Sequence, residues 1–233
     1  MKFFRINKII CNSNFTKKIV DEEYNIDSVV LYPPVDVAKF KALKKENQII
    51  YVGRFSQLTQ SKRQDILIEA FKRFHDNGHI DWKLILAGGV EVGAGDFLTK
   101  LKEAAKTYPI KIIESPSFKD LKSLVGSSIF FWSAAGFGVD EHRNPKQVEH
   151  FGISLVEAMA AGCIPLVYTA GGHKEIVKNN YSGFLWQKEG ELTQLTEKLL
   201  ADNKKMRDLA RQVRQESDKF SYARFEKELL ALL

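Results

Sequence analysis

Two glutamates flank a short glycine-containing segment in the stretch EHFGISLVEAMAAGC. Seven residues separate Glu149 from Glu157. The pattern predicts a loop that ends at Gly152, followed by a helix over residues 153–161 that Gly162 closes, so that Glu149 precedes the helix and Glu157 lies just over one turn inside it. The unbonded N–H groups of a helix start favour a phosphate, and a carboxylate on each side can accept hydrogen bonds from hydroxyl groups. The segment therefore predicts a site for a phosphorylated ligand.

A second group of charged residues follows the strand pattern QIIYVG. This strand is expected to end at Gly53 and Arg54, and Lys62 follows at the start of the next helix. Two cations that flank a glycine at the carboxyl end of a strand can neutralise a diphosphate. Ligands of open α/β sheets bind at that edge of the sheet, which agrees with the phosphate site predicted from the glutamates.

The elements that must position these residues are short β-rich runs that alternate with helical patterns. Several runs are continuously apolar, among them IIYV, KLILA, SIFFW and IPLVY, which is typical of strands buried on both faces of a parallel sheet. Of the helices between them, one is expected to begin at the N-cap Ser61 and another at Asp96. The repeated strand–helix–strand order predicts an α/β fold with a doubly wound, Rossmann-like parallel sheet. The expected strands are residues 8–11, 28–31, 48–52, 82–87, 110–113, 128–132, 163–168 and 184–186.

The clearest boundary in the chain lies at Pro33 and Pro34, which bar a helix and predict an extended linker. About one strand–helix–strand unit precedes the prolines, too little to bury a sheet face by itself. The predicted organisation is an amino-terminal unit with its linker over residues 1–37, a Rossmann-like domain over residues 38–217 and a carboxyl-terminal helix over residues 218–233. The apolar side of that last helix needs a partner surface, and docking on the linker and the amino-terminal unit is favoured over a membrane.

Composition narrows the class of protein. The chain has 233 residues, of which 44% are hydrophobic and 27% charged, which excludes a disulfide-stapled miniprotein, a collagen-like fibre and a disordered tail. A net charge of +6 is spread along the chain, which suits an anionic small molecule or an anionic membrane surface better than nucleic acid. Cys11 and Cys163 each lie in an apolar run and are expected to be buried thiols in a reducing compartment. No apolar run approaches the ~20 residues of a membrane span, and the amino terminus lacks a signal peptide's apolar core. A cytoplasmic location is expected, with peripheral contact at the inner face of a membrane as a further possibility.

Three short motifs occur together in the chain. They are Gly53-Arg54 with Lys62, the spacing of Glu149 and Glu157, and Gly171-Gly172-x-x-Glu175. In this order they resemble the carboxyl-terminal, donor-binding half of the GT-B glycosyltransferases of the large retaining group, family GT4 (group 1). The resemblance covers residues 8–233 but only that half of the family's two-domain architecture. The wording EHFGI and the segment WSAAGFGVDEHRNPKQV look most like bacterial cell-surface polysaccharide transferases, and somewhat like eukaryotic mannosyltransferases of lipid-linked oligosaccharide assembly.

The resemblance implies a role for each matched residue. Arg54 and Lys62 would contact the donor's diphosphate and stabilise the leaving nucleoside diphosphate, because fixed cations stabilise the negative charge that develops there. Glu149 would hold hydroxyl groups of the transferred sugar, and Glu157 would accept hydrogen bonds from the ribose. Glu149, Arg54 and Lys62 are thus the implied catalytic residues. The donor-binding set adds Gly53, the backbone amides of Phe151, Gly152 and Ile153, and the loop Glu114–Phe118, which would cradle the base.

The activity that the resemblance implies is hexosyl transfer with retention. The donor would be a UDP- or GDP-linked sugar, and the acceptor a cell-envelope polysaccharide or a lipid-linked glycan. No cofactor is implied, and a magnesium ion is usually dispensable in such transferases. Two departures from the family pattern stand out: FSQLTQS lengthens the interval between Arg54 and Lys62, and the acceptor domain is represented only by its last strand–helix–strand unit and linker, residues 1–37. The chain is therefore expected to bind the donor and to need an acceptor domain, or a separate subunit that supplies it, for transfer.

Two other functions are compatible with the same residues. A non-catalytic sugar-nucleotide-binding or regulatory subunit would bind its ligand specifically without hydrolysing it. A glycoside hydrolase would use Glu149 and Glu157 as acid and base across an open cleft of ~5–10 Å. The hydrolase leaves the two cations and the glycines without a purpose, and it ranks below the binding subunit.

The remaining candidates are expected to be structural. His142 and His150, with Asp140 and Glu141, match no metal-ligand spacing, so solvated loop residues and no metal are expected. The glycine-rich run GGVEVGAG does not satisfy the dinucleotide pattern G-x-G-x-x-G and is expected to be a flexible turn. His173 could contact the sugar or only begin a short helix.

Overall fold

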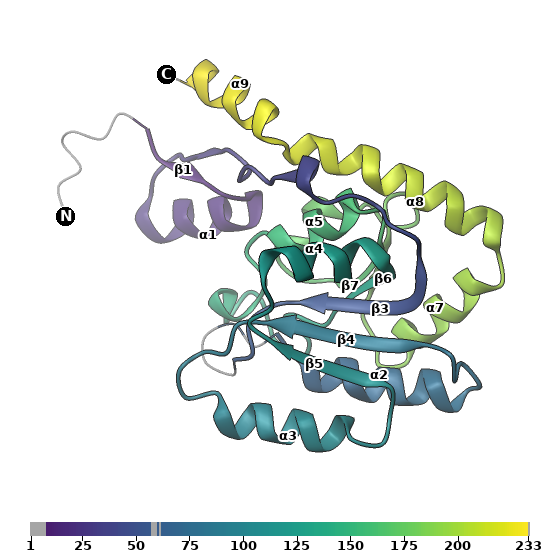
Figure 1. Ribbon diagram of the computed structural model, residues 1–233. Helices are drawn as coiled ribbons and strands as arrows, with labels where there is room; N and C mark the ends of the chain where they lie inside the picture. The colour runs from purple at the N-terminus through teal and green to yellow at the C-terminus, as the bar shows by residue number, and fades with distance from the viewer. Residues whose placement is uncertain (1–7, 57–59, 61, 233) are drawn as a thin grey trace.

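The computed structural model describes residues 8–56, 60 and 62–232. Its main feature is a six-stranded parallel sheet with the order β5-β4-β3-β6-β7-β8 (Figure 1). The chain moves outward from β3 to β5 and then crosses back to β6 on the other side of β3, so the direction of winding reverses between β3 and β6. The strands of this sheet are β3 (Glu46–Val52), β4 (Lys83–Gly88), β5 (Ile110–Glu114), β6 (Ser128–Ser133), β7 (Ile164–Tyr168) and β8 (Phe184–Trp186).

Apolar runs form the central strands because both faces of the sheet are covered. Ile49, Ile50, Phe130 and Phe131 are almost fully buried, as a strand between two helical layers requires. Each run expected to be a strand forms one, with ends that shift by at most 2 residues. The prediction of an α/β fold with a doubly wound parallel sheet is confirmed.

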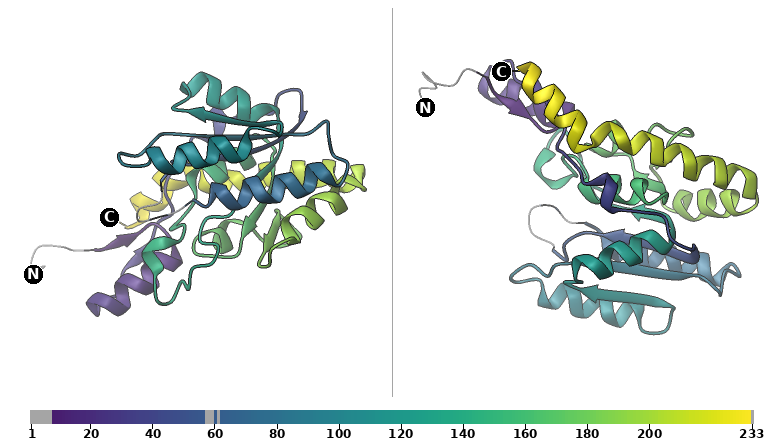
Figure 2. Two further views of the ribbon diagram at one scale, coloured as in Figure 1. Left: turned by 90° about the horizontal axis from the view of Figure 1, so that it is seen from below. Right: turned by 45° about the horizontal axis from the view of Figure 1, so that its top comes forward.

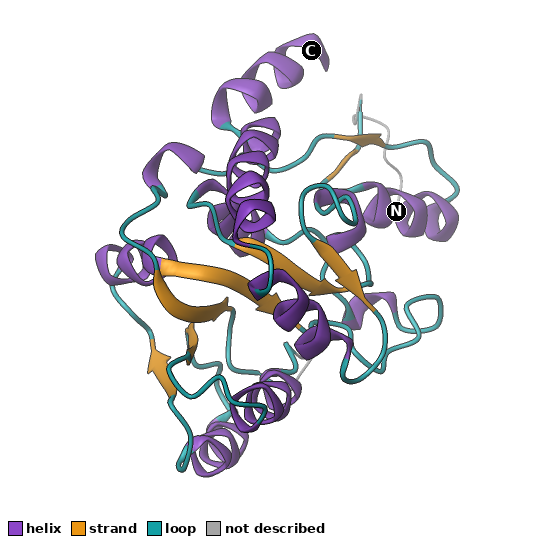
Figure 3. Ribbon diagram, turned by 90° about the vertical axis from the view of Figure 1, so that its right-hand side faces the viewer, coloured by secondary structure: helices purple, strands orange, loops and turns teal. Residues whose placement is uncertain are grey.

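Helices lie on both sides of this sheet (Figures 1, 2 and 3). Above it in Figure 1 lie α4 (Phe118–Ser127), α5 (Ile153–Ala160) and α8 (Asn203–Ser217), and below it lie α2 (Gln64–Asp76) and α3 (Gly95–Ala105). The short α6 (His173–Ile176) follows β7, and α7 (Glu191–Leu200) contacts both α2 and α8. The helices α7 and α8 were not predicted from the sequence.

The start of α2 differs from the prediction. The helix begins at Gln64, and Arg63 precedes it in a left-handed conformation with φ of 51°. Ser61, the predicted N-cap, lies outside the described residues. The side chain of Arg63, the N-cap residue, makes no capping hydrogen bond. The Gln64 carboxamide donates a hydrogen bond to the carbonyl oxygen of Arg54 at 2.9 Å, which ties the start of α2 to the chain after β3.

Two other predicted helix ends agree closely with the structure. The helix α3 begins at Gly95, one residue before the predicted Asp96. The helix α5 ends at Ala160, and Gly162 follows in a left-handed conformation, as expected of a glycine that closes a helix.

The amino-terminal unit is a small strand–helix–strand motif. It consists of β1 (Ile10–Cys11), α1 (Asn14–Tyr24) and β2 (Val29–Val30), and its two strands pair in parallel. The linker that follows contains a single 3-10 turn, η1 (Val37–Lys39). The predicted domain boundaries at residues 37 and 217 remain predictions.

The carboxyl-terminal segment lies beside this unit (Figures 1 and 2). It is divided into a 3-10 turn, η3 (Asp218–Phe220), and α9 (Tyr222–Leu232), where one continuous helix was expected. The Arg224 guanidinium donates to the carbonyl oxygens of Tyr32 and Pro33 at 3.0 and 3.3 Å. The segment therefore docks on the linker.

Both cysteines are buried and free, as predicted. Burial raises the pKa of the Cys163 thiol to about 11, so this thiol stays protonated and unreactive at neutral pH. Among the described residues, no helix is both long and apolar enough to cross a membrane.

Candidate functional site

A cavity of about 740 Å³ lies at the carboxyl ends of the sheet strands. It opens where the winding reverses next to β3, the position at which doubly wound folds bind ligands. Its volume falls within the usual range for a small-molecule site. The lining residues that bear on the chemistry are Asn12, Tyr51, Gly53, Arg54, Gln60, Lys62, Gly88, Gly89, Ser115, Pro116, Glu149, His150, Phe151, Gly152, Ile153, Ser154 and Glu157.

The start of α5 forms one wall of this cavity. Gly152 has φ of +119°, a conformation that L residues rarely adopt, and it turns the chain sharply into the helix. The first helical N–H to find a backbone acceptor is that of Val156, so the N–H groups of residues 153–155 have no partner among the described residues. The Ser154 hydroxyl donates to the carbonyl oxygen of Val52 at 2.8 Å and holds this helix start against the end of β3. This part of the cavity therefore presents free backbone N–H donors at the positive end of the α5 helix dipole, an arrangement that favours an anion.

Lys62 and Glu149 form an ion pair at the floor of the cavity. Their side chains approach to 2.7 Å, and Lys62 is only 7% exposed. Burial raises the pKa of Glu149, but the Lys62 ammonium, together with the nearby His173 and His150, outweighs burial and holds this pKa below its ordinary value of 4.5. The pair therefore gives the cavity an ionised hydrogen-bond acceptor beside a cation. Lys62, expected to contact a diphosphate, also pairs with Glu149.

Arg54 contributes a more exposed cation. Its side chain is 58% exposed and lies 3.2 Å from the carboxylate of Glu91. The two turns that carry Arg54 and Glu91 cross closely, since a Cβ atom at Gly88 would lie 2.1 Å from the carbonyl oxygen of Gly53. Only glycine at position 88 permits this crossing. The turn GGVEVGAG was expected to be merely flexible, but its first two glycines form part of the cavity wall next to Arg54.

Glu157 lies in the second turn of α5, as the spacing predicted. Burial, with a smaller contribution from the negative charge of Asp36, raises its pKa from 4.5 to about 7. In the ligand-free chain this carboxyl group therefore titrates near neutral pH, unlike Glu149. Strongly shifted carboxyl groups in a cavity are typical of functional sites.

Residues from the amino-terminal unit, the linker and a loop of the Rossmann-like domain complete the cavity wall. Asn12 and Pro33 come from the amino-terminal unit and its linker, and Ser115 and Pro116 come from the loop that was predicted to hold the base. His150 lies 3.0 Å from the Gln60 amide, and its ring stacks on Phe15 of α1 at 6.4 Å.

The third predicted motif supports the site from outside the cavity. A Cβ atom at Gly171 would lie 2.1 Å from the carbonyl oxygen of Glu149, and the N–H of Gly172 donates to the same oxygen at 2.8 Å. The Glu175 carboxylate accepts hydrogen bonds from the N–H groups of Asn14 and Phe15 at 2.8 and 2.7 Å. The two glycines thus hold the loop of Glu149 in place, and the glutamate caps α1.

The remaining histidines have structural surroundings. His173 begins α6 and is buried, with Nδ1 3.0 Å from the carbonyl oxygen of Tyr168, and burial lowers its pKa. The backbone N–H of His142 donates a hydrogen bond to the carboxylate of Asp140. Glu141 forms an ion pair with Lys174. Within the described part of the chain, no three His, Cys, Asp or Glu residues lie together as a metal would require.

Several parts of the cavity wall were not expected from the sequence. Tyr51 was included only in an apolar strand run, yet it lines the cavity. Asn12 gave no usable signal, because its place in the wall depends on how the amino-terminal unit docks. His150, expected to be a solvated loop residue, instead lines the cavity. Gly88 and Gly89 form a glycine pair directly after a predicted strand. Such a pair often marks a close approach of two backbone segments, and here it could have predicted the crossing of the turns after β3 and β4.

The fold and the site together define the class of this protein. A doubly wound parallel sheet with two cations, two glutamates and a free helix start at its switch point is a Rossmann-like domain arranged to bind a phosphorylated ligand. Residues 35–216 match the family Glycosyl transferases group 1. The chain belongs to this family, whose members have the GT-B fold.

Comparisons with known proteins agree with this assignment. The chain is 30% identical to the GDP-Man:Man(3)GlcNAc(2)-PP-Dol alpha-1,2-mannosyltransferase of Dictyostelium discoideum, over 93% of this chain and 44% of that protein. It is 28% identical to an uncharacterized glycosyltransferase, MJ1178, of Methanocaldococcus jannaschii, over 93% of this chain and 56% of that protein. The crystal structure of Anabaena Alr3699/HepE in complex with UDP and glucose has a similar fold, with a TM-score of 0.80 at 18% identity over 97% of this chain and 62% of that one. The chain thus spans less than two thirds of each of these relatives.

Proposed function

We propose that this chain binds a nucleotide-diphosphate sugar in the cavity beside β3. The observation that carries the proposal is the convergence of Arg54, Lys62, Glu149 and the free start of α5 on one cavity. The helix start and the two cations suit a diphosphate, and the ionised Glu149 suits sugar hydroxyl groups. Glu157, whose carboxyl group lines the same cavity, is assigned to the ribose.

We further propose that the bound sugar is transferred, with retention, to a lipid-linked or cell-envelope glycan. The Dictyostelium relative is named for a GDP-mannose donor and a dolichyl-diphosphate acceptor, which makes GDP-mannose the first donor to test. During transfer, negative charge would develop on the leaving diphosphate, next to Arg54, Lys62 and the N–H groups of α5. Lys62 is held by Glu149 and the start of α5 by the Ser154 hydrogen bond, and such fixed groups are what electrostatic stabilisation of a leaving group requires.

The test is calorimetric titration of the 233-residue chain with GDP-mannose, UDP-glucose, GDP, UDP and ADP. The expected result is preference for one base, and a ~10–100-fold weaker affinity in Arg54→Met because one charge-assisted contact is lost. The variant Arg207→Met, which removes an exposed cation on α8 away from the cavity, is the matched control and should bind as the unchanged chain does. A cooperatively folded chain that binds none of the five compounds would contradict the proposal.

A non-catalytic sugar-nucleotide-binding subunit is the alternative. It predicts the same titration but no donor hydrolysis and no transfer when an acceptor domain is supplied as a separate chain. Release of free hexose from GDP-mannose or UDP-glucose would exclude it. Proton NMR of the product's anomeric centre then tests retention.

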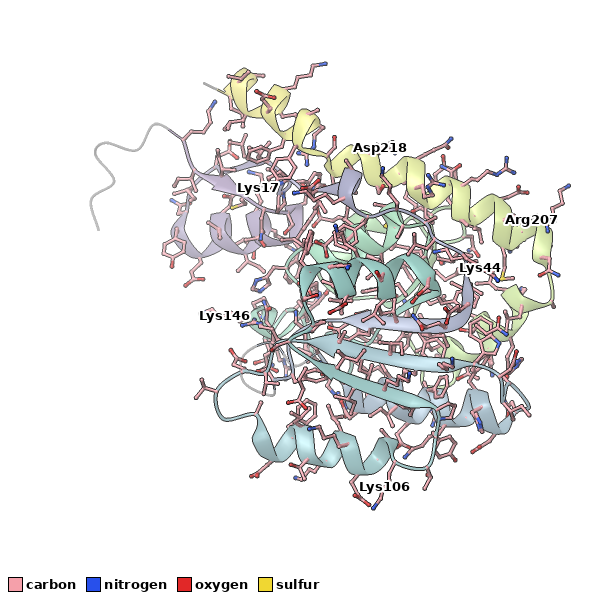
Figure 4. The ribbon with its side chains drawn as sticks, viewed as in Figure 1. Lys17, Lys44, Lys106, Lys146, Arg207 and Asp218 are labelled. Atoms are coloured by element: carbon pink, nitrogen blue, oxygen red, sulfur yellow. The ribbon has the colours of Figure 1, made fainter. Side chains whose placement is uncertain are left out.

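We also propose peripheral contact with an anionic membrane, which a lipid-linked acceptor would require. Four cations of α8 recur every three or four residues and are therefore on one face of the helix, namely Lys204, Arg207, Arg211 and Arg214. Figure 4 places Arg207 and Lys44 at the same end of the molecule. Pelleting with phosphatidylserine vesicles should be lost at high salt and in an Arg207→Glu, Arg214→Glu variant, and equal pelleting with neutral vesicles would contradict the proposal.

A further inference from the structure

Tyr51 is a buried residue of the cavity wall that none of the three motifs includes. It lies next to the end of β3, and the residue is only 3% exposed. Its ring packs against Phe131 of β6 at 5.9 Å between centroids, so the direction of the side chain is set by the core. The residue nevertheless lines the 740 Å³ cavity.

The hydroxyl group of Tyr51 has no hydrogen-bond partner among the described residues, although those residues include every side chain named above in the cavity wall. The Tyr51 oxygen is not among the fully buried polar atoms without a partner, so it reaches the cavity, where water can hydrate it. A ligand oxygen that enters the cavity can replace that water as the acceptor of this hydrogen bond.

The position of this oxygen relative to the phosphate-binding turn is narrowly defined. A Cβ atom at Gly53 would lie 2.4 Å from the Tyr51 oxygen, so the hydroxyl lies directly against the backbone between β3 and Arg54. Any side chain at position 53 would cover it. Gly53 therefore leaves the hydroxyl open to a ligand as well as allowing the turn.

The charges around the hydroxyl indicate what it can do. Burial, and then the negative charge of Glu149, raise the pKa of Tyr51 well above 10, while Arg54 opposes the shift. The phenol therefore stays protonated at any physiological pH and can serve as a donor. It lines the same cavity as Glu149, assigned to the sugar, and Arg54, assigned to the diphosphate, and a phosphate oxygen is a strong acceptor for its hydrogen bond.

We propose that the Tyr51 hydroxyl donates a hydrogen bond to the sugar-linked phosphate of the bound nucleotide sugar. The inference rests on the proposed donor function of the same cavity. It assigns Tyr51 as a donor-binding residue beyond the three motifs, and it explains why a tyrosine stands where the buried strand would accept phenylalanine.

The test is calorimetric titration of Tyr51→Phe with GDP, GMP and GDP-mannose, and with UDP, UMP and UDP-glucose. This substitution keeps the ring contact with Phe131 and removes only the oxygen. Affinity for the diphosphates and for the sugar conjugates should fall ~10-fold, and affinity for the monophosphates should not change, because they lack the second phosphate. Tyr168→Phe, a half-buried residue at the end of β7 that is not part of the cavity wall, is the matched control and should bind all six compounds unchanged.

Three results would overturn the proposal, and they differ in meaning. Equal affinities in Tyr51→Phe and the unchanged chain would remove Tyr51 from the site and leave the donor function standing. A loss confined to the sugar conjugates would assign the hydroxyl to the sugar instead of the phosphate. Failure of the unchanged chain to bind any of the six compounds would refute the donor function, and the assignment of Tyr51 with it.

Discussion

Replacement of Glu157 by glutamine should stabilise the ligand-free chain at alkaline pH while weakening nucleotide binding. The pKa of this carboxyl group is raised from 4.5 to about 7, chiefly by burial and then by the charge of Asp36. The folded chain therefore holds a proton on Glu157 that the unfolded chain releases. As pH rises from about 4.5 to 7, the folded state binds more protons than the unfolded state at this position, so the carboxyl group reduces the free energy of unfolding over that window.

The size of the effect follows from the shift. A tenfold change in an acid dissociation constant corresponds to about 1.4 kcal/mol, so a rise from 4.5 to about 7 corresponds to at most about 3 kcal/mol above neutral pH. Part of the side chain remains accessible through the cavity, and we expect about 1–3 kcal/mol. Glutamine has nearly the same shape and no charge, so Glu157→Gln should abolish this cost.

The assay is urea unfolding of the unchanged chain and of Glu157→Gln at pH 5 and pH 8. The stability difference between the two proteins should move by about 1–3 kcal/mol in favour of the variant between these pH values, because every other titrating group cancels in the comparison. Glu103→Gln, on the solvent-exposed side of α3, should show no such movement. If the difference between Glu157→Gln and the unchanged chain is the same at both pH values, Glu157 is not a desolvated carboxyl group and the reasoning is wrong.

Three further predictions concern contacts around the cavity. Lys62→Met should lower the free energy of unfolding by about 2–3 kcal/mol in urea, since it leaves the carboxylate of Glu149 desolvated without its cation; a loss below about 0.5 kcal/mol would show that water already screens the pair. Glu175→Gln should speed amide hydrogen exchange at the start of α1 while GDP affinity stays unchanged, and protected amides in the variant would contradict the capping role. Gly88→Ala should destabilise the chain by about 2 kcal/mol or more, because its Cβ atom would lie 2.1 Å from a backbone carbonyl oxygen. Gly89→Ala is the matched control for that variant, since a Cβ atom there meets nothing within 4 Å, and equal stability of the two alanine variants would refute the prediction.

Much of the fold could be predicted from local sequence. The apolar runs predicted the strands because a strand buried on both faces has no polar alternation, and the order of strands and helices predicted a doubly wound sheet. The positions of Glu149 and Glu157 relative to α5 followed from helical geometry alone. These are short-range properties, set by neighbouring residues along the chain.

The start of α2 was predicted less well. A serine before an amphipathic pattern predicted an N-cap at position 61, whereas the helix begins at Gln64 with Arg63 as its N-cap. The Gln64 side chain is tied to the chain after β3 by a hydrogen bond to Arg54. No pattern within a few residues of Gln64 could have shown it.

The candidate site also combines features set by local sequence with features set by tertiary contacts. The sequence by itself determined that two cations, two glutamates and a glycine-led helix start occur at the ends of buried strands. Only the tertiary structure decided that Lys62 pairs with Glu149, 87 residues away, that Tyr51 is the core phenol whose oxygen meets the cavity, and that Glu175 caps α1 across 160 residues. Periodicity and spacing specify which way a side chain points relative to its own element. The choice of partner depends on which elements the sheet brings together, and that is decided when the whole core packs.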